Sequence, residues 1–136
     1  MATADTVTRR GIAARIAALP EAVNRDAALV RRGWFLNATW QLDIGDDAFL
    51  VRIAEGKIAE VRQGPFVTPS ADFAMIAAPE IWHRLLVRAP APPGDQDFLA
   101  FVKRREMKLA GNLQKLMSHL LYFKGLLTHL REEVLA

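Results

Sequence analysis

The spacing of hydrophobic positions changes several times along this chain of 136 residues. In residues 8–19 apolar side chains recur every three or four positions, which predicts a helix that ends at Pro20. Because proline suits the first turn of a helix, Pro20 can open a second one that runs to about Arg32. The N-terminal part of the chain, residues 8–32, is therefore expected to be helical.

The next segment predicts strands. Residues 34–44 place an apolar side chain at every second position, which is typical of a half-buried strand with one apolar face. A turn at 45–47 leads into a second strand that carries Phe49, Val51 and Ile53, and Glu55 with Gly56 leads into a third at 57–62. These three strands form an expected antiparallel meander.

Five more elements follow, with breaker-rich loops at 63–70 and 89–95. They are a strand at 72–77, a helix opened by Pro79 and Glu80, a short helical turn at 97–104, a strand at 108–112, and a terminal helix that Asn112 opens. The terminal helix is leucine-rich, and its apolar residues cover roughly half of its circumference, more than a surface helix needs.

The order of elements predicts an α+β fold in two layers. A sheet face that bears Trp40, Phe49 and Met75 would be a large exposed apolar patch unless helices covered it. The length allows a core but not two independent units, so residues 1–136 are expected to form a single domain, with the helical part at 8–32 and the core at 33–131.

Composition narrows the function classes. Hydrophobic residues make up 51% of the chain and charged residues 24%, as in globular proteins, and there is no cysteine. With no membrane-length apolar run and no signal-peptide pattern, a cytoplasmic protein is expected.

The net charge of +3 includes basic clusters at Arg9–Arg10, Arg31–Arg32 and Lys103–Arg105, which suit an anionic membrane surface or simply a solvated face. Nucleic acid is not expected as a partner, because the aromatic residues follow apolar patterns.

No catalytic, metal or cofactor site is expected. His119 and His129 lie ten residues apart on one predicted helix, about 15 Å by its rise, too far to share a metal ion. Ser118 and His119 are neighbours and point about 100° apart, so they do not form a nucleophile and base. The glycines build no phosphate-binding loop.

Several of these features together resemble the sterol carrier protein type two family. They are the meander with Trp40, the helix with Pro79, Glu80 and Trp82, the loop before Phe98, and Lys108 with Gly111 and Asn112 ahead of a leucine-rich helix. The resemblance covers about residues 33–131. The glycine that usually precedes the lysine of the last strand is absent, and the C-terminal VLA is not a peroxisomal tail, so the chain is more similar to a bacterial single-domain member.

The resemblance implies a curved five-stranded, mainly antiparallel sheet covered by helices, with an apolar tunnel between them that binds acyl lipids, sterols or isoprenoids. A non-enzymatic binding or transfer function follows from it, without a cofactor. The residues expected to line the tunnel are Trp40, Phe49, Val51, Phe73, Met75, Trp82, Phe98, Phe101, Leu116, Met117, Leu120 and Lys124.

Two points stay open at the level of sequence. Lys124 either lies in water because Gly125 ends the buried helix, or lies at a tunnel mouth where its ammonium meets an anionic headgroup. The chain is alternatively a structural or interaction module with a self-filled core, or an accessory factor that presents a hydrophobic substrate such as a quinone precursor to enzymes. A homodimer is compatible with the sequence.

Overall fold

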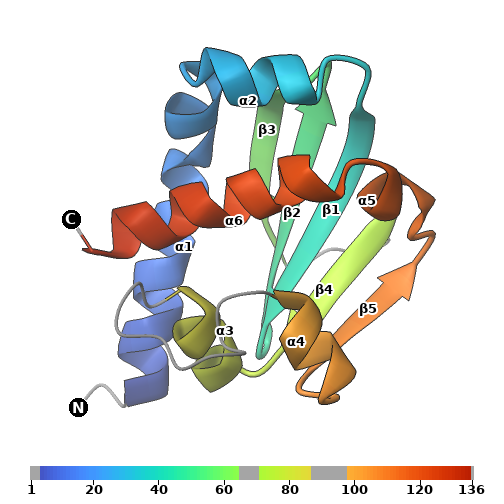
Figure 1. Cartoon of the computed structure of the whole chain (residues 1–136). Coiled ribbons are helices and arrows are strands. Elements are labelled where there is room, and N and C mark those ends of the chain that lie inside the picture. The colour runs from blue at the N-terminus through green and yellow to red at the C-terminus, as the bar shows by residue number, and fades with distance from the viewer. Residues whose placement is uncertain (1–3, 65–70, 87–97, 136) are drawn as a thin grey trace.

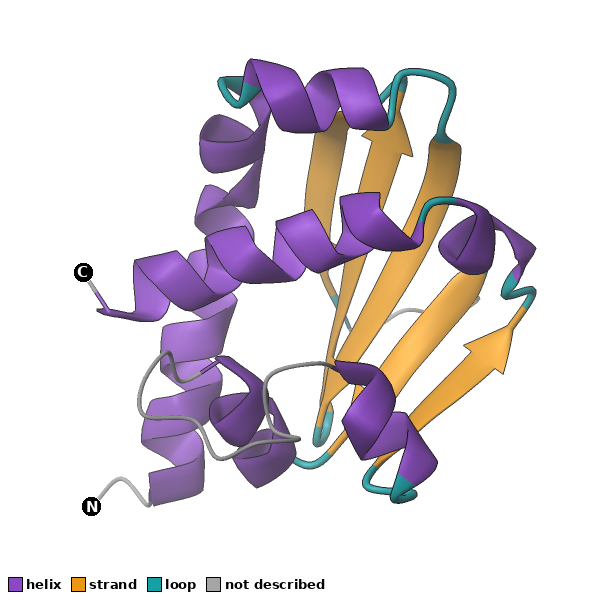
Figure 2. Cartoon of the chain, in the orientation of Figure 1, coloured by secondary structure: helices purple, strands orange, loops and turns teal. Residues whose placement is uncertain are grey.

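The computed structural model describes residues 4–64, 71–86 and 98–135, with side chains described from Gly11 to Leu130. A five-stranded sheet forms one layer, and helices on one side of it form the other, with the terminal helix crossing the sheet (Figures 1 and 2). In chain order the elements are α1 (Ala4–Asn24), α2 (Ala27–Arg32), β1 (Asn37–Ile44), β2 (Asp47–Ala54), β3 (Lys57–Gln63), β4 (Phe73–Ala77), α3 (Pro79–Leu86), α4 (Phe98–Lys103), β5 (Met107–Gly111), α5 (Gln114–Ser118) and α6 (Leu120–Leu135).

The sheet has the strand order β3-β2-β1-β4-β5. The pairs β1–β2, β2–β3 and β4–β5 are antiparallel, and the central pair β1–β4 is parallel. The hairpin turns use left-handed backbone, with φ of 62° at Gly45 in the first and of 52° at Glu55 and 80° at Gly56 in the second. The mainly antiparallel five-stranded sheet and the α+β class are confirmed.

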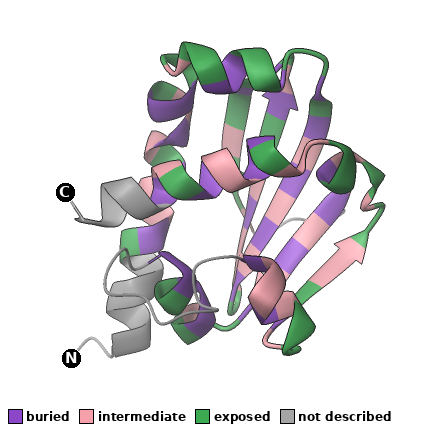
Figure 3. Cartoon of the chain, viewed as in Figure 1, coloured by how far each residue is buried: buried purple, intermediate pink, exposed green. Residues whose placement is uncertain are grey.

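The period-two pattern of the strands is also confirmed. On β1 the side chains of Ala38, Trp40, Leu42 and Ile44 are buried, while the residues between them are half-buried (Figure 3). The matching faces of β2 and β4 point the same way and join one apolar core with the helices. This face of the sheet carries the candidate site.

The predicted helix boundary at Pro20 is wrong, because α1 continues through it to Asn24. Buried apolar residues on both sides of the proline hold the helix against the core, and that packing outweighs one missing backbone hydrogen bond. The true boundary is set by tertiary contacts. The side-chain amide of Asn24 pairs with the backbone of Ile58, at 2.8 Å and 3.1 Å, and Asp26 caps α2 by accepting from the N–H of Leu29 at 3.1 Å.

The predicted continuous terminal helix is wrong as well. The helix begins at Gln114, with Leu113 as its N-cap residue, and the side-chain oxygen of Asn112 accepts from the N–H of Gln114 at 3.0 Å; His119 lies between α5 and α6 with a non-helical backbone. Gly125 does not end the buried helix, because α6 runs on with Leu127 and Leu130 in the core. Each helix therefore presents its own apolar stripe.

The first strand begins later than its pattern indicates. β1 starts at Asn37, and the preceding Trp34 and Phe35 lie in the connection from α2, with exposed fractions of 54% and 88%. Leu36, which follows them, is buried, so the alternation of apolar and polar residues extended the predicted strand beyond its true N-terminal end.

Candidate functional site

The candidate site is the apolar space between the sheet and the helices that cover it. Most of the residues predicted to line a tunnel are buried and belong to one continuous core: Trp40, Phe49, Val51, Phe73, Met75, Trp82, Phe98, Phe101 and Leu116. They come from three strands and three helices that are distant in the sequence. The structure therefore brings these side chains together.

Three predicted lining residues occupy other environments. Leu120, at the start of α6, is half-buried and packs against the core. Met117 is 50% exposed on α5, and Lys124 is half-buried on α6. The prediction placed Met117 and Lys124 on one apolar side because it assumed one straight helix. The break at His119 shows that this assumption is wrong.

Phe123 of α6 is the centre of an aromatic cluster in this space. Its ring makes edge contacts with Trp40, Phe73 and Tyr122, at centroid distances of 5.7 Å, 5.2 Å and 5.6 Å. Each such contact contributes about 0.5–1.5 kcal/mol beyond the burial of its area. Two strands are thus joined to α6 by one side chain.

The indole N–H of Trp40 has no acceptor among the described residues. The residue is 0% exposed, so its nitrogen is shielded from bulk solvent. An unpaired buried donor costs about 1–3 kcal/mol, whereas the indole N–H of Trp82, equally buried, donates to the backbone oxygen of Asp43 at 2.9 Å. Trp40 is therefore a free hydrogen-bond donor in an otherwise apolar space.

One end of α6 is held by a contact with two glycines. The hydroxyl of Tyr122 donates to the backbone oxygen of Gly56 at 2.6 Å, and burial raises the pKa of Tyr122 well above its usual value. A Cβ at Gly33 would lie 2.5 Å from the Tyr122 ring. There is thus no spare room where the start of α6 packs against the α2–β1 connection and the β2–β3 turn.

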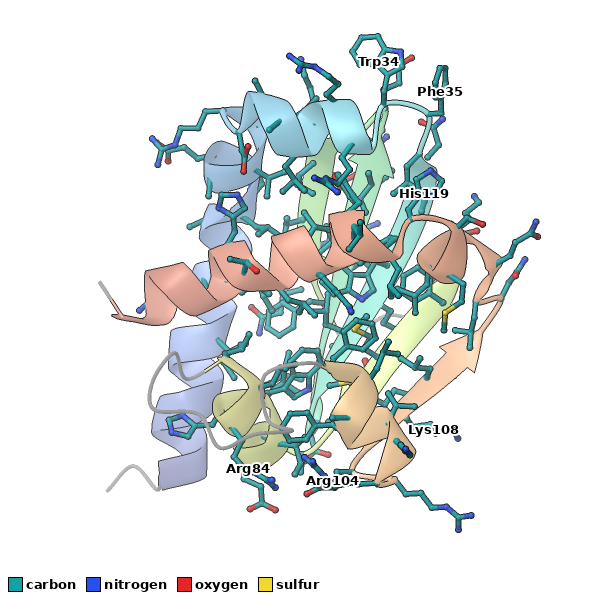
Figure 4. All side chains as sticks on the ribbon, in the orientation of Figure 1. Trp34, Phe35, Arg84, Arg104, Lys108 and His119 are labelled. Carbon is teal, nitrogen blue, oxygen red and sulfur yellow. The ribbon has the colours of Figure 1, made fainter. Side chains whose placement is uncertain are left out.

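Charged side chains lie at the opposite end of the apolar space. Arg84 and Arg104 place their guanidinium carbons 5.1 Å and 4.7 Å from the centre of the Phe101 ring, and both pair with Glu106, at 2.6 Å and 2.5 Å (Figure 4). These two arginines, Arg104 first, hold the pKa of Glu106 below its usual range. Phe101 is thereby fixed between α3 and β5.

A separate groove of about 380 Å³ lies between α1 and β3. It is open to solvent and is lined by Ala13, Ala17, Pro20, Phe49, Ala59, Glu60, Val61 and Gln63. Only Phe49 among these belongs to the predicted lining, so this groove is not the expected tunnel.

Sequence reasoning missed two residues of the site, Tyr122 and Phe123. The residues of α6 buried in the core, Tyr122, Phe123, Leu126, Leu127 and Leu130, have a helical spacing of their own. The sequence placed Phe123, Leu127 and Leu130 among the apolar residues of one terminal helix, together with Leu121, which is 62% exposed.

The described residues contain no group of three or more His, Asp or Glu side chains placed to hold a metal ion. Among the described helices none is long and apolar enough to cross a membrane.

Comparison with known proteins relates the chain to others through its structure. No protein-family model matches the chain, and no curated protein matches its sequence. A crystal structure of sterol carrier protein 2 superimposes with a TM-score of 0.71 and 17% identity, over 88% of this chain and 95% of that one. A conserved hypothetical protein from Thermus thermophilus, described as possibly a sterol carrier protein, gives 0.64 and 15%, over 88% and 86%.

A third structure, titled UbiJ-SCP2 ubiquinone synthesis protein, covers 97% of this chain and 96% of its own, with a TM-score of 0.56 and 20% identity. A sec-alkylsulfatase from Pseudomonas also matches, but over only 14% of its own length. The order of strands, the covering helices and these superpositions over 88–97% of the chain agree, and they confirm the resemblance at the level of the fold: this chain has the sterol carrier protein 2 fold.

Proposed function

We propose that this protein binds a hydrophobic small molecule between its sheet and its helices, without catalysing a reaction on it. The observation that carries the proposal is the match to the sterol carrier protein 2 structure over 88% of this chain, with the predicted lining residues gathered on the apolar side of the sheet. Acyl lipids, sterol-like molecules and isoprenoids are the ligand classes, and transfer between membranes is the associated role.

A ligand in this space has to displace side chains. Phe123 contacts Trp40 and Phe73, both of which belong to the predicted lining, so its ring occupies part of the space that a ligand would use. We propose that α6 is the element that yields, because Phe123 is the side chain that joins it to both strands. In the alternative, a self-filled core, the Phe123 ring stays in place and no ligand enters.

The ligand class follows partly from Trp40. Its free N–H favours a ligand that places a hydrogen-bond acceptor, such as a carbonyl oxygen, deep in the apolar space. An ester, a ketone or a quinone has such an acceptor, and a plain hydrocarbon has none.

The direct test is native mass spectrometry of protein purified from its own host, to detect a bound lipid. A delipidated sample is then titrated with acyl, sterol and isoprenoid ligands, with tryptophan emission and melting temperature as readouts. A bound ligand should raise the melting temperature by mass action. The self-filled core is favoured instead if a saturating series of all three classes leaves the melting temperature unchanged.

A variant of Phe123 sharpens this test. Phe123→Leu should lower the stability of the empty protein and increase the thermal shift on ligand addition, because it enlarges the space beside Trp40 and Phe73. Ile16→Val is the matched control: Ile16 is as fully buried, on α1 and outside the aromatic cluster. Its loss of stability should leave the ligand response as in the parent protein.

A second candidate function is the presentation of a hydrophobic substrate to separate enzymes. It is supported by the match to the UbiJ-SCP2 ubiquinone synthesis protein over nearly the whole of both chains. The identity of the co-purifying molecule separates the two candidates: a ring carrying an isoprenoid tail supports presentation, and a mixture of phospholipid or fatty acyl species supports lipid transfer.

The basic clusters proposed from the sequence for membrane contact, and the two loops at 63–70 and 89–95, are only partly described. The loop at 89–95 and the side chains of Arg9 and Arg10 lie outside the described residues, as does most of the loop at 63–70. Lys103, the last residue of α4, and Arg105 are exposed, while Arg104 is engaged by Glu106. A proposed docking role for 103–105 therefore rests on two of its three charges.

A further inference from the structure

Two large aromatic side chains project from one end of the molecule. Trp34 is 54% exposed and Phe35 is 88% exposed, and they are adjacent in the connection from α2 to β1. Figure 4 shows both beyond the N-terminal end of β1, away from the rest of the protein. Single exposed apolar residues are ordinary, but two adjacent large aromatic residues at one tip are a candidate contact surface.

The fold holds this tip in place. Gly33 donates its backbone N–H to the oxygens of Leu29 and Val30, both at 3.2 Å, and packs against the Tyr122 ring. On the other side Leu36 is 1% exposed and donates its N–H to the oxygen of Gly33 at 2.8 Å. Buried residues on both sides pin the connection, so Trp34 and Phe35 point into solvent because the backbone directs them there.

Basic residues lie beside the two aromatic residues in the sequence and at the same end of the sheet. Arg31 and Arg32 form the last turn of α2 and are exposed, and Lys57, which begins β3 at the same end of the sheet, is exposed too. Glu55 is the acidic side chain in the adjoining turn, so cations outnumber anions by three to one within this set. Aromatic residues flanked by basic ones are typical of protein surfaces at a lipid headgroup region.

We propose that Trp34, Phe35, Arg31 and Arg32 form a docking tip that inserts into the headgroup layer of an anionic lipid bilayer. The two rings enter the boundary between headgroups and acyl chains, while the guanidinium groups bind lipid phosphates. Two aromatic side chains are too little surface for a stable protein dimer, which buries about 800 Å² on each partner, but they suffice for reversible membrane contact assisted by charge.

This proposal concerns a different end of the molecule from residues 103–105. Figure 4 places Arg84, Arg104 and Lys108 at the end opposite to Trp34 and Phe35. The ends are separated by the length of β1, eight residues or about 25 Å. The two proposed contact surfaces cannot both face one flat bilayer, so an experiment can choose between them.

Trp34 is itself the reporter for the test. Trp40 and Trp82 are 0% exposed, so protection of tryptophan emission from a water-soluble quencher reports on Trp34. On addition of vesicles of phosphatidylcholine with phosphatidylglycerol, the emission should shift to the blue and become protected from a water-soluble quencher. Vesicles of phosphatidylcholine alone should give a much smaller change, and added salt should reduce binding.

Variants locate the contact in a vesicle co-sedimentation assay. Arg31→Gln with Arg32→Gln should weaken binding about 25-fold, at about fivefold for each charge. Lys103→Gln with Lys108→Gln is the matched control, because it removes two exposed charges from the opposite end. Trp34→Ala with Phe35→Ala should also weaken binding. Met117→Ala with Leu121→Ala should not, although it removes the other two large apolar residues that are exposed in the described part of the chain.

The docking tip depends on the proposed lipid function only for its biological purpose, and the two fail separately. Ligand binding to the delipidated protein in the absence of vesicles should be unchanged in the Trp34→Ala, Phe35→Ala variant. The proposal is overturned if vesicle binding follows the Lys103→Gln, Lys108→Gln variant, or if the tip variants change only a concentration-dependent self-association measured by sedimentation. Equal binding to neutral and anionic vesicles would also overturn it.

Discussion

At the scale of single residues, close packing around Tyr122 holds the start of α6 in place. Its hydroxyl donates to Gly56, and its ring fills the place that a side chain at Gly33 would need. Gly56 combines a positive φ with a Cβ position that would overlap the backbone oxygen of Val30, so no other residue fits there without rearrangement. Tyrosine at position 122 therefore depends on glycine at position 33, and the backbone that accepts its hydrogen bond depends on glycine at position 56.

The first residue-scale prediction concerns Gly33. Gly33→Ala should destabilise the protein by about 1–3 kcal/mol in urea unfolding, because the new methyl group overlaps a buried ring that is also fixed by a hydrogen bond. Gly11→Ala is the control: it lies within α1 with nothing within 4 Å of the added atom, and should stabilise by roughly 0.5–1 kcal/mol.

A double variant tests the cause. In a Tyr122→Leu background the same Gly33 change should cost less than in the parent protein, since the ring that it meets is gone. Equal costs in the two backgrounds would show that the Tyr122 ring is not the reason for glycine at position 33.

The second residue-scale prediction concerns the free N–H of Trp40. Trp40→Phe should weaken the binding of a carbonyl-bearing lipid about 2- to 13-fold relative to a hydrocarbon of equal length, which is the effect of losing one hydrogen bond. Trp82→Phe is the matched control, because that N–H is already satisfied by Asp43. Titrations followed by melting temperature give both ratios, and an equal loss for the two ligands in Trp40→Phe would mean that the N–H does not contact them.

At the scale of elements, α2 is held by its first residue and by the last helix. Asp26 accepts from the N–H of Leu29 and lies 2.8 Å from the imidazole of His129 on α6. The contact with His129 is the main reason that the pKa of Asp26 lies below 3.8, and the bond from Leu29 adds to it. One carboxylate thus caps α2 and connects it to α6.

Two substitutions of Asp26 separate the stabilisation that comes from its helix cap from the stabilisation that comes from its charge. Asp26→Ala should cost about 0.5–2 kcal/mol at pH 7 through loss of the cap, whereas Asp26→Asn keeps an acceptor and should cost less. Because the folded pKa is lowered, the charge stabilises the protein above pH 3.8, and that stabilisation disappears as the pH falls below this value. The difference between parent and Asp26→Asn in urea unfolding should therefore shrink from pH 7 to pH 3; a difference independent of pH would rule out the charge.

Helices and strands could be predicted where the spacing of apolar residues in a segment matches the side chains that the segment buries. The meander, β4, α3 and β5 follow their period and their turn residues closely. The errors occur where distant residues decide. Pro20 lies within α1 because core contacts hold the helix on both sides, and the boundary at Asn24 depends on Ile58, 34 residues away.

The candidate site was predictable in part for the same reason. Strand residues such as Trp40 and Met75 follow from alternation, which fixes the face on which they lie. The residues of α6 did not follow, because one non-helical residue at His119 changes which side chains face the sheet. Phe123 and the exposed pair Trp34 and Phe35 could be recognised only from the three-dimensional arrangement.

At the scale of the whole molecule, the proposed ligand space and the proposed docking tip are mechanically connected. Gly33, next to Trp34, packs on Tyr122, and the adjacent Phe123 contacts Trp40 and Phe73. A bilayer that pulled on the tip would therefore act on α6, the element proposed to yield for the ligand. In hydrogen exchange, anionic vesicles should deprotect the amides at the start of α6 and leave those of β4 and β5 unchanged; unchanged exchange in α6 would mean that the tip docks without affecting the ligand space.

The parallel pair at the centre of the sheet also bears on how the chain folds. The meander of β1, β2 and β3 closes through two tight turns, whereas β4 reaches β1 only across the 28 residues from Gly45 to Asp72 and then pairs with β5 across α3 and α4. Short loops lose less chain entropy on closing, so the meander is the natural nucleus. Destabilising changes in the β2–β3 turn should then mainly slow folding, and those in β5 should mainly speed unfolding. The edge formed by β4 and β5 would be the last part to join and the first to leave.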